Sequence, residues 1–526
     1  MICRAPSKPV VVPNDTAEHP DAPLVVESES EGEEEEEDFD QPVMPLPPPQ
    51  ALRDSRVWGQ MSMDGGESVT SRYSFTIKED RLIDWNVEVL MSFLEKVVQH
   101  RLVTETKNLR FGKSSKNESP FGTNRGSLED RESGLIIDEV AEVITLPKFN
   151  SRYKPPPACS RLLPPEIRYQ MKEFVASIAS MYRDVPFHNF EHASHVTMSA
   201  NKLIKRIVTP AEDASKYESD LHFSTFGISS DPLTQFAVVF SALIHDVDHT
   251  GLPNSQLVKE QSTIARIFNN KSVAEQNSVV VAWELLMEPR FSDLQTCIFA
   301  FESDRRRFRQ LVVNAVMATD IMDRDMVTLR KKRWEKAFDP SLSNDTFLLD
   351  VDVNRKATIV IEHIIQASDV AHTMQHWHIF IKWNTKLYRE LHQAYINGHA
   401  NEDPSEGWYE GQIGFFDNYI IPLAKKLKEC GVFGVSGDEY LTYAQMNRTE
   451  WEQKGREETK KMIRSRRAMA MNGSTSSGFT TGVSCTSSGF TGISIHSQNN
   501  NHPEEPEMSA GITSRRSGAH NRGVHR

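Results

Sequence analysis

The 526-residue sequence predicts an all-α fold, in which a compact multi-helix domain is flanked by disordered tails. Two observations lead to this class. From residue 138 onward, apolar residues recur with the 3.6-residue period of a helix, and the two-residue alternation typical of strands is scarce. Both ends of the chain are instead polar and rich in proline, serine or glycine. Such segments bury too little apolar surface to offset the entropy that is lost on ordering.

Four regions follow one another along the chain. We predict a disordered acidic and proline-rich tail over residues 1–75 and a helix plus polar linker over residues 76–137. Apolar residues at helical spacing place this helix at residues 81–102, where it either packs on the next domain or connects to it. Residues 138–455 are predicted to form one mostly helical domain. Residues 456–526 read as a basic helix end followed by a Ser/Gly-rich disordered tail.

The charge of the chain argues against a nucleic-acid partner. The net charge is −13, but the segment Glu27–Asp40 alone holds ten acidic residues and no basic one. The remaining chain is therefore close to −3, and it offers no basic face of the size that nucleic-acid binding needs. The acidic segment itself is typical of a solvated tail, through which regulatory partners could bind.

Cysteine usage and apolar stretches indicate a reducing, cytoplasmic environment. The five cysteines lie far apart and form no CxxC pair, which argues against a disulfide framework or a zinc ribbon. The N-terminal residues lack the apolar core of a secretion signal, and no apolar stretch is long enough to span a bilayer. We expect a cytoplasmic protein without a transmembrane segment.

Histidines and carboxylates gather in two segments, FHNFEHASHV (187–196) and HDVDHTGLPN (245–254). The second segment ends an apolar helix that we expect to begin at Asp231-Pro232 and to stop at residues 251–254, where Gly and Pro break it. On a helix, histidines four residues apart share a face, as would His188 with His192 and His245 with His249. Asp246 adds a carboxylate directly after His245. Imidazole and carboxylate together suit a borderline metal such as zinc beside a hard one such as magnesium.

A packed or surface histidine pair is the simpler interpretation of either segment alone. The HD-x-x-H pattern of the second segment is more specific, because ionisable groups buried in an apolar helix without partners would be costly. A third carboxylate should come from another helix. Asp369, in the segment IEHIIQASDVAHT (361–373), is placed to supply it, although alone it would be an ordinary helix-end aspartate.

Four motifs together resemble the class I, or mammalian-type, 3',5'-cyclic nucleotide phosphodiesterases. They are HN-x-x-H, HDxxHxGxxN, ASD and QIGFFDNYIIPL, and the resemblance runs from about residue 139 to residue 434. It implies that residues 138–455 are a helical HD-type phosphodiesterase catalytic domain. The implied reaction opens cAMP and/or cGMP to nucleoside 5'-monophosphates. The implied cofactors are two divalent ions, Zn²⁺ and Mg²⁺ (or Mn²⁺), and the implied partner is the small cyclic nucleotide itself.

The resemblance also assigns roles to individual residues. The implied metal ligands are His192, His245, Asp246 and Asp369, with Asp246 bridging both ions. The implied general acid is His188, which gives a proton to the leaving O3′. Water near the ions would be oriented by His249 and Glu275, while Asn254 would be structural. The implied purine contacts are a hydrogen bond from Gln412 and ring stacking on Phe415.

The sequence departs from the family pattern at four places. Phe187 stands where a tyrosine is usual, and His372 stands where many members have an asparagine that touches the base. We therefore count both among the residues expected at the substrate. His195 replaces a usual aspartate, and Asn277-Ser278 replaces a usual histidine pair. None of these changes removes an implied metal ligand, so they affect base selectivity and the surroundings of the ions rather than the class of reaction.

Two rival functions can be weighed from the sequence. A catalytically silent cyclic nucleotide sensor predicts loss of the acid or of a ligand, and none is lost. Another HD-type phosphohydrolase would act on a different nucleotide, but the pair Gln412 and Phe415 suits a compact cyclic mononucleotide better. The reaction itself requires an activated hydroxide and a proton donor for a basic leaving group, which two metals and a histidine provide.

Overall fold

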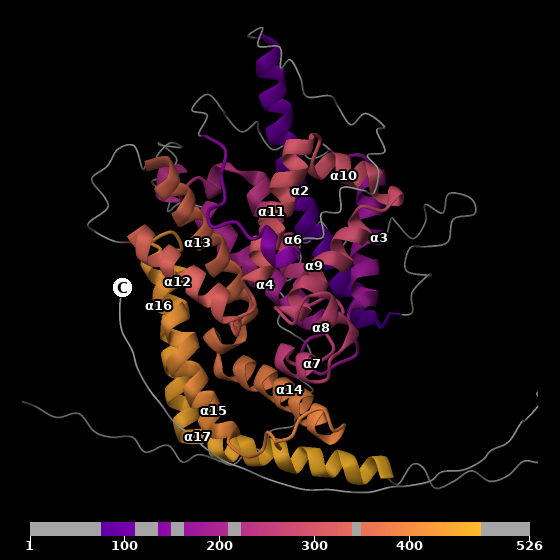
Figure 1. Cartoon of the computed structure of the whole chain (residues 1–526), viewed down its shortest axis with the longest axis vertical. Helices are drawn as coiled ribbons and strands as arrows, with labels where there is room; N and C mark the ends of the chain where they lie inside the picture. Colours follow the sequence, from indigo (N-terminus) through magenta and orange to yellow (C-terminus); the bar gives the residue numbers. More distant parts are fainter. Residues whose placement is uncertain (1–74, 111–134, 149–162, 209–221, 339–348, 475–526) are drawn as a thin grey trace, which may run out of the picture. The chain divides into compact units, whose positions relative to one another are not determined.

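The computed structural model describes residues 75–110, 135–148, 163–208, 222–338 and 349–474 (Figure 1). All of them belong to the second of two units into which the chain divides, residues 73–526. No strand occurs among these described residues, which confirms the all-α prediction. The polar linker and the greater part of both predicted tails lie outside the described residues.

The N-terminal half surrounds α6, which lies at the centre of Figure 1 and packs against α2, α4, α9 and α11. The helices of this half are α2 (Ile77–Arg110), α3 (Pro165–Met181), α4 (Phe190–Val208), α6 (Pro232–Ile244), α7 (Asn254–Lys259), α8 (Thr263–Ile267), α9 (Val273–Leu286), α10 (Ser292–Ile298) and α11 (Glu302–Met317). Short 3₁₀ turns connect some of them: η2 (Ile136–Glu139), η4 (Ile228–Ser230) and η5 (Pro289–Phe291).

The C-terminal half joins the first through α13, which packs against α4, α6 and α11. Its elements are α12 (Arg324–Phe338), α13 (Leu349–Asp369), η7 (Ala371–Met374), α14 (Trp377–Ile396), α15 (Trp408–Phe415), the π-helical turn η8 (Phe416–Ile420), α16 (Ile421–Glu429) and α17 (Val435–Ser474). The long helix α17 packs against α14, α15, α16 and η7. It runs without interruption through the predicted boundary at residue 455, and the domain boundaries remain predictions.

Helix α2 extends beyond the predicted residues 81–102 at both ends. Its start is fixed by a reciprocal cap: the Glu79 backbone N–H donates to Thr76 Oγ1 (3.2 Å), and the Thr76 backbone N–H donates to Glu79 Oε2 (2.7 Å). One face of the helix is buried, and it packs against α3, α4 and α6. Of the two arrangements considered for this helix, the structure therefore has the packed one.

Helix α6 begins at Pro232 as predicted, but two details of the expectation are wrong. The Asp231 side chain makes no cap hydrogen bond to the helix; it accepts instead from Thr234 Oγ1 (2.5 Å) and from the Arg307 guanidinium (2.5 and 3.1 Å). The helix also ends at Ile244 and not at residues 251–254. The following turn contains Asp248 with φ +64°, a left-handed conformation that cannot continue a right-handed helix.

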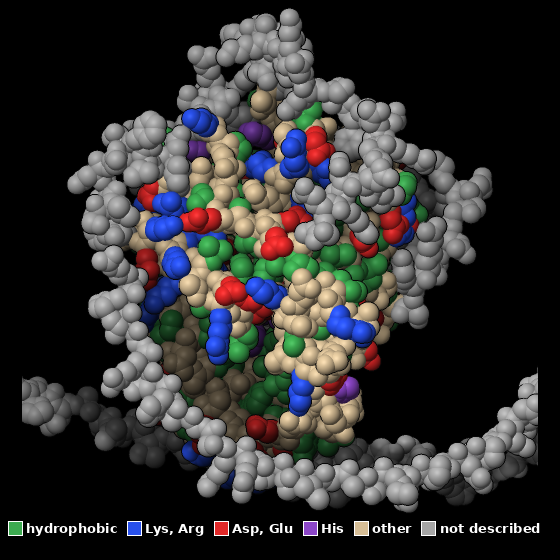
Figure 2. Space-filling model, in the orientation of Figure 1, with side chains coloured by type: hydrophobic (Ala, Val, Ile, Leu, Met, Phe, Trp, Pro, Cys, Tyr) green, Lys and Arg blue, Asp and Glu red, His purple; other side chains and the backbone are tan. Residues whose placement is uncertain are grey.

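The described surface is mixed in charge. On the face drawn in Figure 2, Lys and Arg side chains are interspersed with Asp and Glu, and neither sign forms a separate field. This agrees with the balanced charge of the chain outside its acidic segment. Among the described residues, no helix combines the length and the apolar character needed to cross a membrane.

Candidate metal centre

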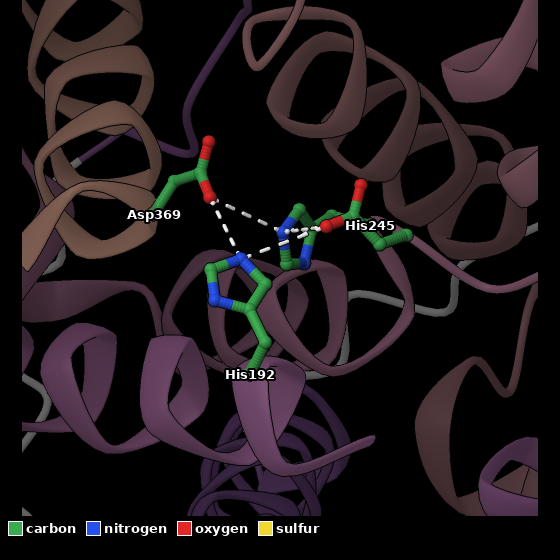
Figure 3. Close-up of side chains that lie close together, drawn as sticks. His192, His245 and Asp369 are labelled. Carbon is green, nitrogen blue, oxygen red and sulfur yellow. Dashed lines mark hydrogen bonds and ion pairs between the residues drawn. The ribbon is translucent and has the colours of Figure 1, made fainter. Parts of the chain in front are cut away.

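Three helices bring together the four side chains that the sequence predicts as metal ligands. Helix α4 carries His192, the turn after α6 carries His245 and Asp246, and α13 ends at Asp369. One nitrogen or oxygen from each residue lies within 4.8 Å of the others (Figure 3). His192 Nε2 lies 3.1 Å from Asp369 Oδ1 and 3.6 Å from Asp246 Oδ2. His245 Nε2 lies 3.0 Å from Asp246 Oδ2 and 3.5 Å from Asp369 Oδ1. The four side chains thus converge on one point.

The donors of this group suit a cation. His245 Nδ1 is bonded to the Ala242 carbonyl, which directs Nε2 towards the two carboxylates. Nε2 is buried, yet it makes no well-aligned hydrogen bond with any described residue, although the two carboxylate oxygens are close. A ligand nitrogen aimed between two carboxylates, with its other nitrogen held by a backbone carbonyl, is the usual arrangement of a metal-binding histidine.

Both carboxylates are ionised at neutral pH. Burial would raise the pKa of Asp369, but the adjacent His192 and His245 imidazoles outweigh burial and hold the pKa well below its usual range. Burial also opposes ionisation of Asp246, and His245 again outweighs it, so that the pKa of Asp246 is lowered. Burial lowers the pKa of His245, but Asp246 and Asp369 outweigh burial and raise it, so this imidazole is protonated beside the two carboxylates. A divalent cation bound here would take the place of that proton and neutralise the carboxylates.

The helical spacing that suggested these pairs is not the reason that they meet. His188 precedes α4, and His249 lies in the turn after α6, so neither predicted pair shares a helical face. The ligands instead occupy helix ends, where the chain changes direction and adjacent residues point to different sides. The four side chains thus lie close together, although not on the shared helical faces that their spacing suggested.

A second group lies beside the first and contains His188, His249 and Glu390. The rings of His188 and His249 are 4.0 Å apart, and the rings of His188 and His192 are 5.9 Å apart. Glu390 of α14 has a side chain that is only 3% exposed, and its Oε1 makes a short hydrogen bond to His188 Nδ1. Its Oε2 accepts from the backbone N–H groups of Phe187 (2.7 Å) and His188 (3.0 Å). Glu390 therefore fixes both the backbone and the ring of His188.

This pairing separates the protonation of the two histidines. Burial lowers the pKa of His188, but the Glu390 carboxylate outweighs burial and raises the pKa to about 9. Burial also lowers the pKa of His249, and the neighbouring His188 lowers it further, to about 4. At neutral pH, His188 is thus protonated and His249 is neutral. Such opposed pKa shifts in one site are typical of residues with distinct acid and base roles.

Glu390 was missed by the sequence analysis. It stands in LYRELHQAY, an ordinary amphipathic helix segment, twenty-one residues after Asp369 and outside every motif. Only the packing of α14 brings it to His188. The one signal in the sequence is that Glu390 lies on the apolar side of its helix, where an acidic residue needs a partner.

Glu275 belongs to neither group. It accepts a hydrogen bond from Asn254 Nδ2 (2.9 Å), and the same amide lies 3.4 Å from Asp320 Oδ2. Burial raises the pKa of Glu275 to about 8, and the nearby Asp320 carboxylate adds to this effect. Asn254 Oδ1 also accepts from the Ala274 backbone N–H (2.9 Å), which ties the start of α7 to α9. Asp320 is a further buried carboxylate that no motif had indicated.

Phe187 and His372 are buried, with residual exposures of 5% each. The Phe187 ring lies against the rings of His188 (4.8 Å), His192 (4.6 Å) and His372 (5.6 Å). Burial lowers the pKa of His372 well below its usual range, so its imidazole is neutral. Phe187 thus covers the ring of His192 in the candidate metal centre, and its own ring also contacts His372.

The two predicted purine contacts lie on α15. Gln412 is 8% exposed, and no described residue makes a hydrogen bond to its side-chain amide. The Phe415 ring is stacked on the Tyr419 ring, with the ring centroids 5.5 Å apart and an interplanar angle of 21°. Burial and the Asp369 charge both raise the pKa of Tyr419, which places this aromatic pair within electrostatic reach of the metal centre. Among the described residues, no hydrogen bond or ring contact joins Gln412 or Phe415 to the two histidine groups.

Comparisons with known proteins agree with this geometry. The family model of the 3'5'-cyclic nucleotide phosphodiesterases matches residues 187–431, which contain both histidine groups and α15. A 3',5'-cyclic-AMP phosphodiesterase, isoform F, of Drosophila melanogaster is 26% identical over 336 residues, which are 60% of this chain and 45% of that protein. The cGMP-specific 3',5'-cGMP phosphodiesterase 3 of Dictyostelium discoideum is 24% identical over 263 residues, 48% of this chain and 50% of that protein.

Among solved structures, the chain is similar to the phosphodiesterase domain of Salpingoeca rosetta rhodopsin phosphodiesterase. The sequence identity is 21%, the TM-score is 0.43, and the match covers 58% of this chain and 83% of that one. The chain spans half or less of the two curated relatives described above. Residues 187–431 thus match the family model of the 3'5'-cyclic nucleotide phosphodiesterases, and the curated relatives that the chain resembles carry phosphodiesterase names.

Proposed function

We propose that the protein hydrolyses 3',5'-cyclic nucleotides, cAMP and/or cGMP, to nucleoside 5'-monophosphates. One observation carries the proposal: a buried group of two imidazoles and two ionised carboxylates lies next to a histidine that a buried glutamate keeps protonated. A phosphodiester is anionic and has a basic leaving group. Its hydrolysis therefore needs charge neutralisation at phosphorus and a proton at the departing oxygen, and these two groups offer both.

The four-residue group would hold divalent ions, for which we propose Zn²⁺ and Mg²⁺ (or Mn²⁺). Imidazole nitrogen suits zinc, and carboxylate oxygen with water suits magnesium. Such ions supply hydroxide at neutral pH and neutralise charge on the phosphate. Asp246 is the residue we expect to serve both ions, while His249 and Glu275 would orient water around them.

His188 would supply the proton. Its Nδ1 is held by Glu390, which leaves Nε2 as the nitrogen that can face the substrate. Hydroxide forms a new bond to phosphorus, the bond from phosphorus to O3′ breaks, and O3′ takes the proton of His188 Nε2. The product is the 5'-monophosphate with a free 3'-hydroxyl. The Glu390 carboxylate would hold the His188 ring in place and keep it protonated at neutral pH.

The purine would bind at α15. Gln412 offers one acceptor and two donors, and Phe415 has one ring face against Tyr419 and so presents the other to a base. The amide has no hydrogen-bond partner among the described residues, so it can turn by half a rotation and pair with either adenine or guanine. His372 and Phe187 would influence the substrate from beside His192, because the Phe187 ring contacts the rings of both His192 and His372.

The test is hydrolysis of each cyclic nucleotide by the purified full chain, with the product identified by chromatography. We expect a 5'-monophosphate, loss of activity after chelation, and recovery with added Zn²⁺ and Mg²⁺. A 3'-monophosphate product, or activity that persists after complete removal of metal, would contradict the proposal. Binding of cyclic nucleotide without turnover would favour the silent sensor instead.

A further inference from the structure

The turn after α6, residues 245–250, carries the proposed ligands His245 and Asp246. Hydrogen bonds within the turn do not by themselves fix its backbone. Asp248 has φ +64°, a left-handed conformation that is uncommon for a residue other than glycine. Within the turn, the Val247 N–H donates to the Ile244 carbonyl (3.1 Å) and the His249 N–H donates to the Asp246 carbonyl (3.0 Å). Because these are short-range bonds of a single turn, the placement of Asp246 has to be fixed from outside it.

Helix α9 supplies two such contacts from consecutive residues. Ser278 Oγ donates to the Val247 carbonyl at 2.9 Å, and both residues are fully buried. Asn277 Nδ2 donates to Asp248 Oδ2 at 3.1 Å. A third contact comes from Arg183 Nε to Asp248 Oδ1 at 2.8 Å, but the Arg183 side chain is 49% exposed, so water competes with it.

We propose that Asn277 and Ser278 are positioning residues that set the affinity of the centre for divalent metal. Ser278 anchors the residue directly after the ligand Asp246, and Asn277 anchors the next one, so α9 fixes the two residues between Asp246 and His249. Neither side chain belongs to the ligand group, so each acts through the turn. The inference rests on the metal centre of the proposed function.

The choice of these two residue types has a chemical consequence. Both are neutral, so they hold the turn without adding a positive charge beside Asp246. A positively charged partner from α9 would repel the incoming cation. An amide and a hydroxyl do not offset the negative charge of the two carboxylates. Loss of a hydrogen bond that orients a metal ligand usually weakens metal binding by about 10- to 100-fold.

The test measures metal binding and not hydrolysis. The metal-free full chain is titrated with Zn²⁺, and separately with Mn²⁺, against a competing fluorescent chelator at fixed pH. We expect Ser278→Ala and Asn277→Ala each to weaken binding by roughly tenfold or more. The matched control is Ser177→Ala, which removes a hydroxyl that is equally buried and donates to the Glu173 carbonyl (2.8 Å) of α3. It should lower the melting temperature of the metal-free protein without changing metal affinity.

The outcomes separate the positioning role from a general loss of stability. Wild-type affinity in both α9 variants would overturn the proposal, as would an equal loss of affinity in Ser177→Ala. Asn277 is only half-buried, so Asn277→Ala keeps the test decisive if Ser278→Ala does not fold. A wild-type chain that binds metal through this turn but hydrolyses no cyclic nucleotide would refute the proposed function and leave the positioning role standing. A wild-type chain that binds no divalent metal would overturn both.

Discussion

The metal end and the purine end of the candidate site differ in how firmly the surrounding protein holds them. At the metal end, Glu390 makes three hydrogen bonds to Phe187 and His188, and the four ligand residues converge within 4.8 Å. At the purine end, the Gln412 amide has no hydrogen-bond partner among the described residues, and Phe415 is stacked on a single neighbouring ring. On the proposed function, chemistry at phosphorus would depend on a fixed arrangement, whereas the choice of base would depend on side chains that can turn.

Removal of one of the four clustered side chains of the metal end should have the largest effect. Asp246→Ala should lower turnover by roughly a thousandfold or more, since metal-based charge stabilisation is worth several kcal/mol and each tenfold is about 1.4 kcal/mol. Turnover is measured after chelation and addition of fresh metal, with metal content determined in parallel. The control is Asp325→Ala, because the Asp325 side chain is 79% exposed and pairs with Lys271 at the surface. Near wild-type turnover in Asp246→Ala would refute the assignment of this carboxylate.

Removing the proton donor should have a smaller effect. His188→Ala is expected to lower kcat by about a hundredfold, the usual scale for loss of a general acid, with metal content unchanged. An aryl phosphodiester, whose leaving group needs little protonation, should be affected much less. An equal loss on both substrates would mean that His188 is not the acid.

The variant Glu390→Gln keeps His188 and removes the negative charge that raises the pKa of His188. In Glu390→Gln the side-chain amide can still accept from the two backbone N–H groups. Burial is then opposed only by the weaker effects of Asp246 and Asp369, so the His188 pKa falls. The acid form, present below a pKa of about 9 in the wild type, would be lost at lower pH. We expect the alkaline fall of kcat to move to lower pH, so that the variant is close to wild type at pH 6 and reduced by roughly tenfold at pH 8. The same loss at every pH would indicate damage to the fold instead.

The sequence indicates the four side chains of the metal end but not the residue Glu390 that lies beside them. His192, His245, Asp246 and Asp369 stand in short motifs, and the structure brings all four together. Glu390 stands in no motif, because a single buried carboxylate needs only one correctly packed helix and leaves no spacing to detect. Such a contact is decided by tertiary packing.

The ends of helices were the other point at which sequence reasoning failed. The apolar run of α6 gives no sign that the helix ends at Ile244, because the break depends on the left-handed Asp248 and its partners on α9. Aspartate tolerates this conformation better than most residues but does not require it. The all-α class, by contrast, follows from periodicity over the whole chain and is insensitive to any one residue.

The smallest expected effect concerns the choice of base, because a purine end held by few contacts should discriminate only weakly between adenine and guanine. If no neighbour locks the Gln412 amide, one glutamine serves adenine and guanine, and kcat/KM for the two cyclic nucleotides should differ by no more than about ten- to a hundredfold. His372 is neutral because burial lowers its pKa, so it offers one donor and one acceptor whose places can exchange between tautomers. An asparagine at this position would carry an amide able to pair with the adenine edge, so His372→Asn should shift the ratio towards cAMP by several-fold. Both nucleotides compete in one tube, and the two products are counted separately, so that the ratio is independent of enzyme concentration. A wild-type preference above a thousandfold would show that Gln412 is locked, and an unchanged ratio in the variant would show that His372 does not influence the base.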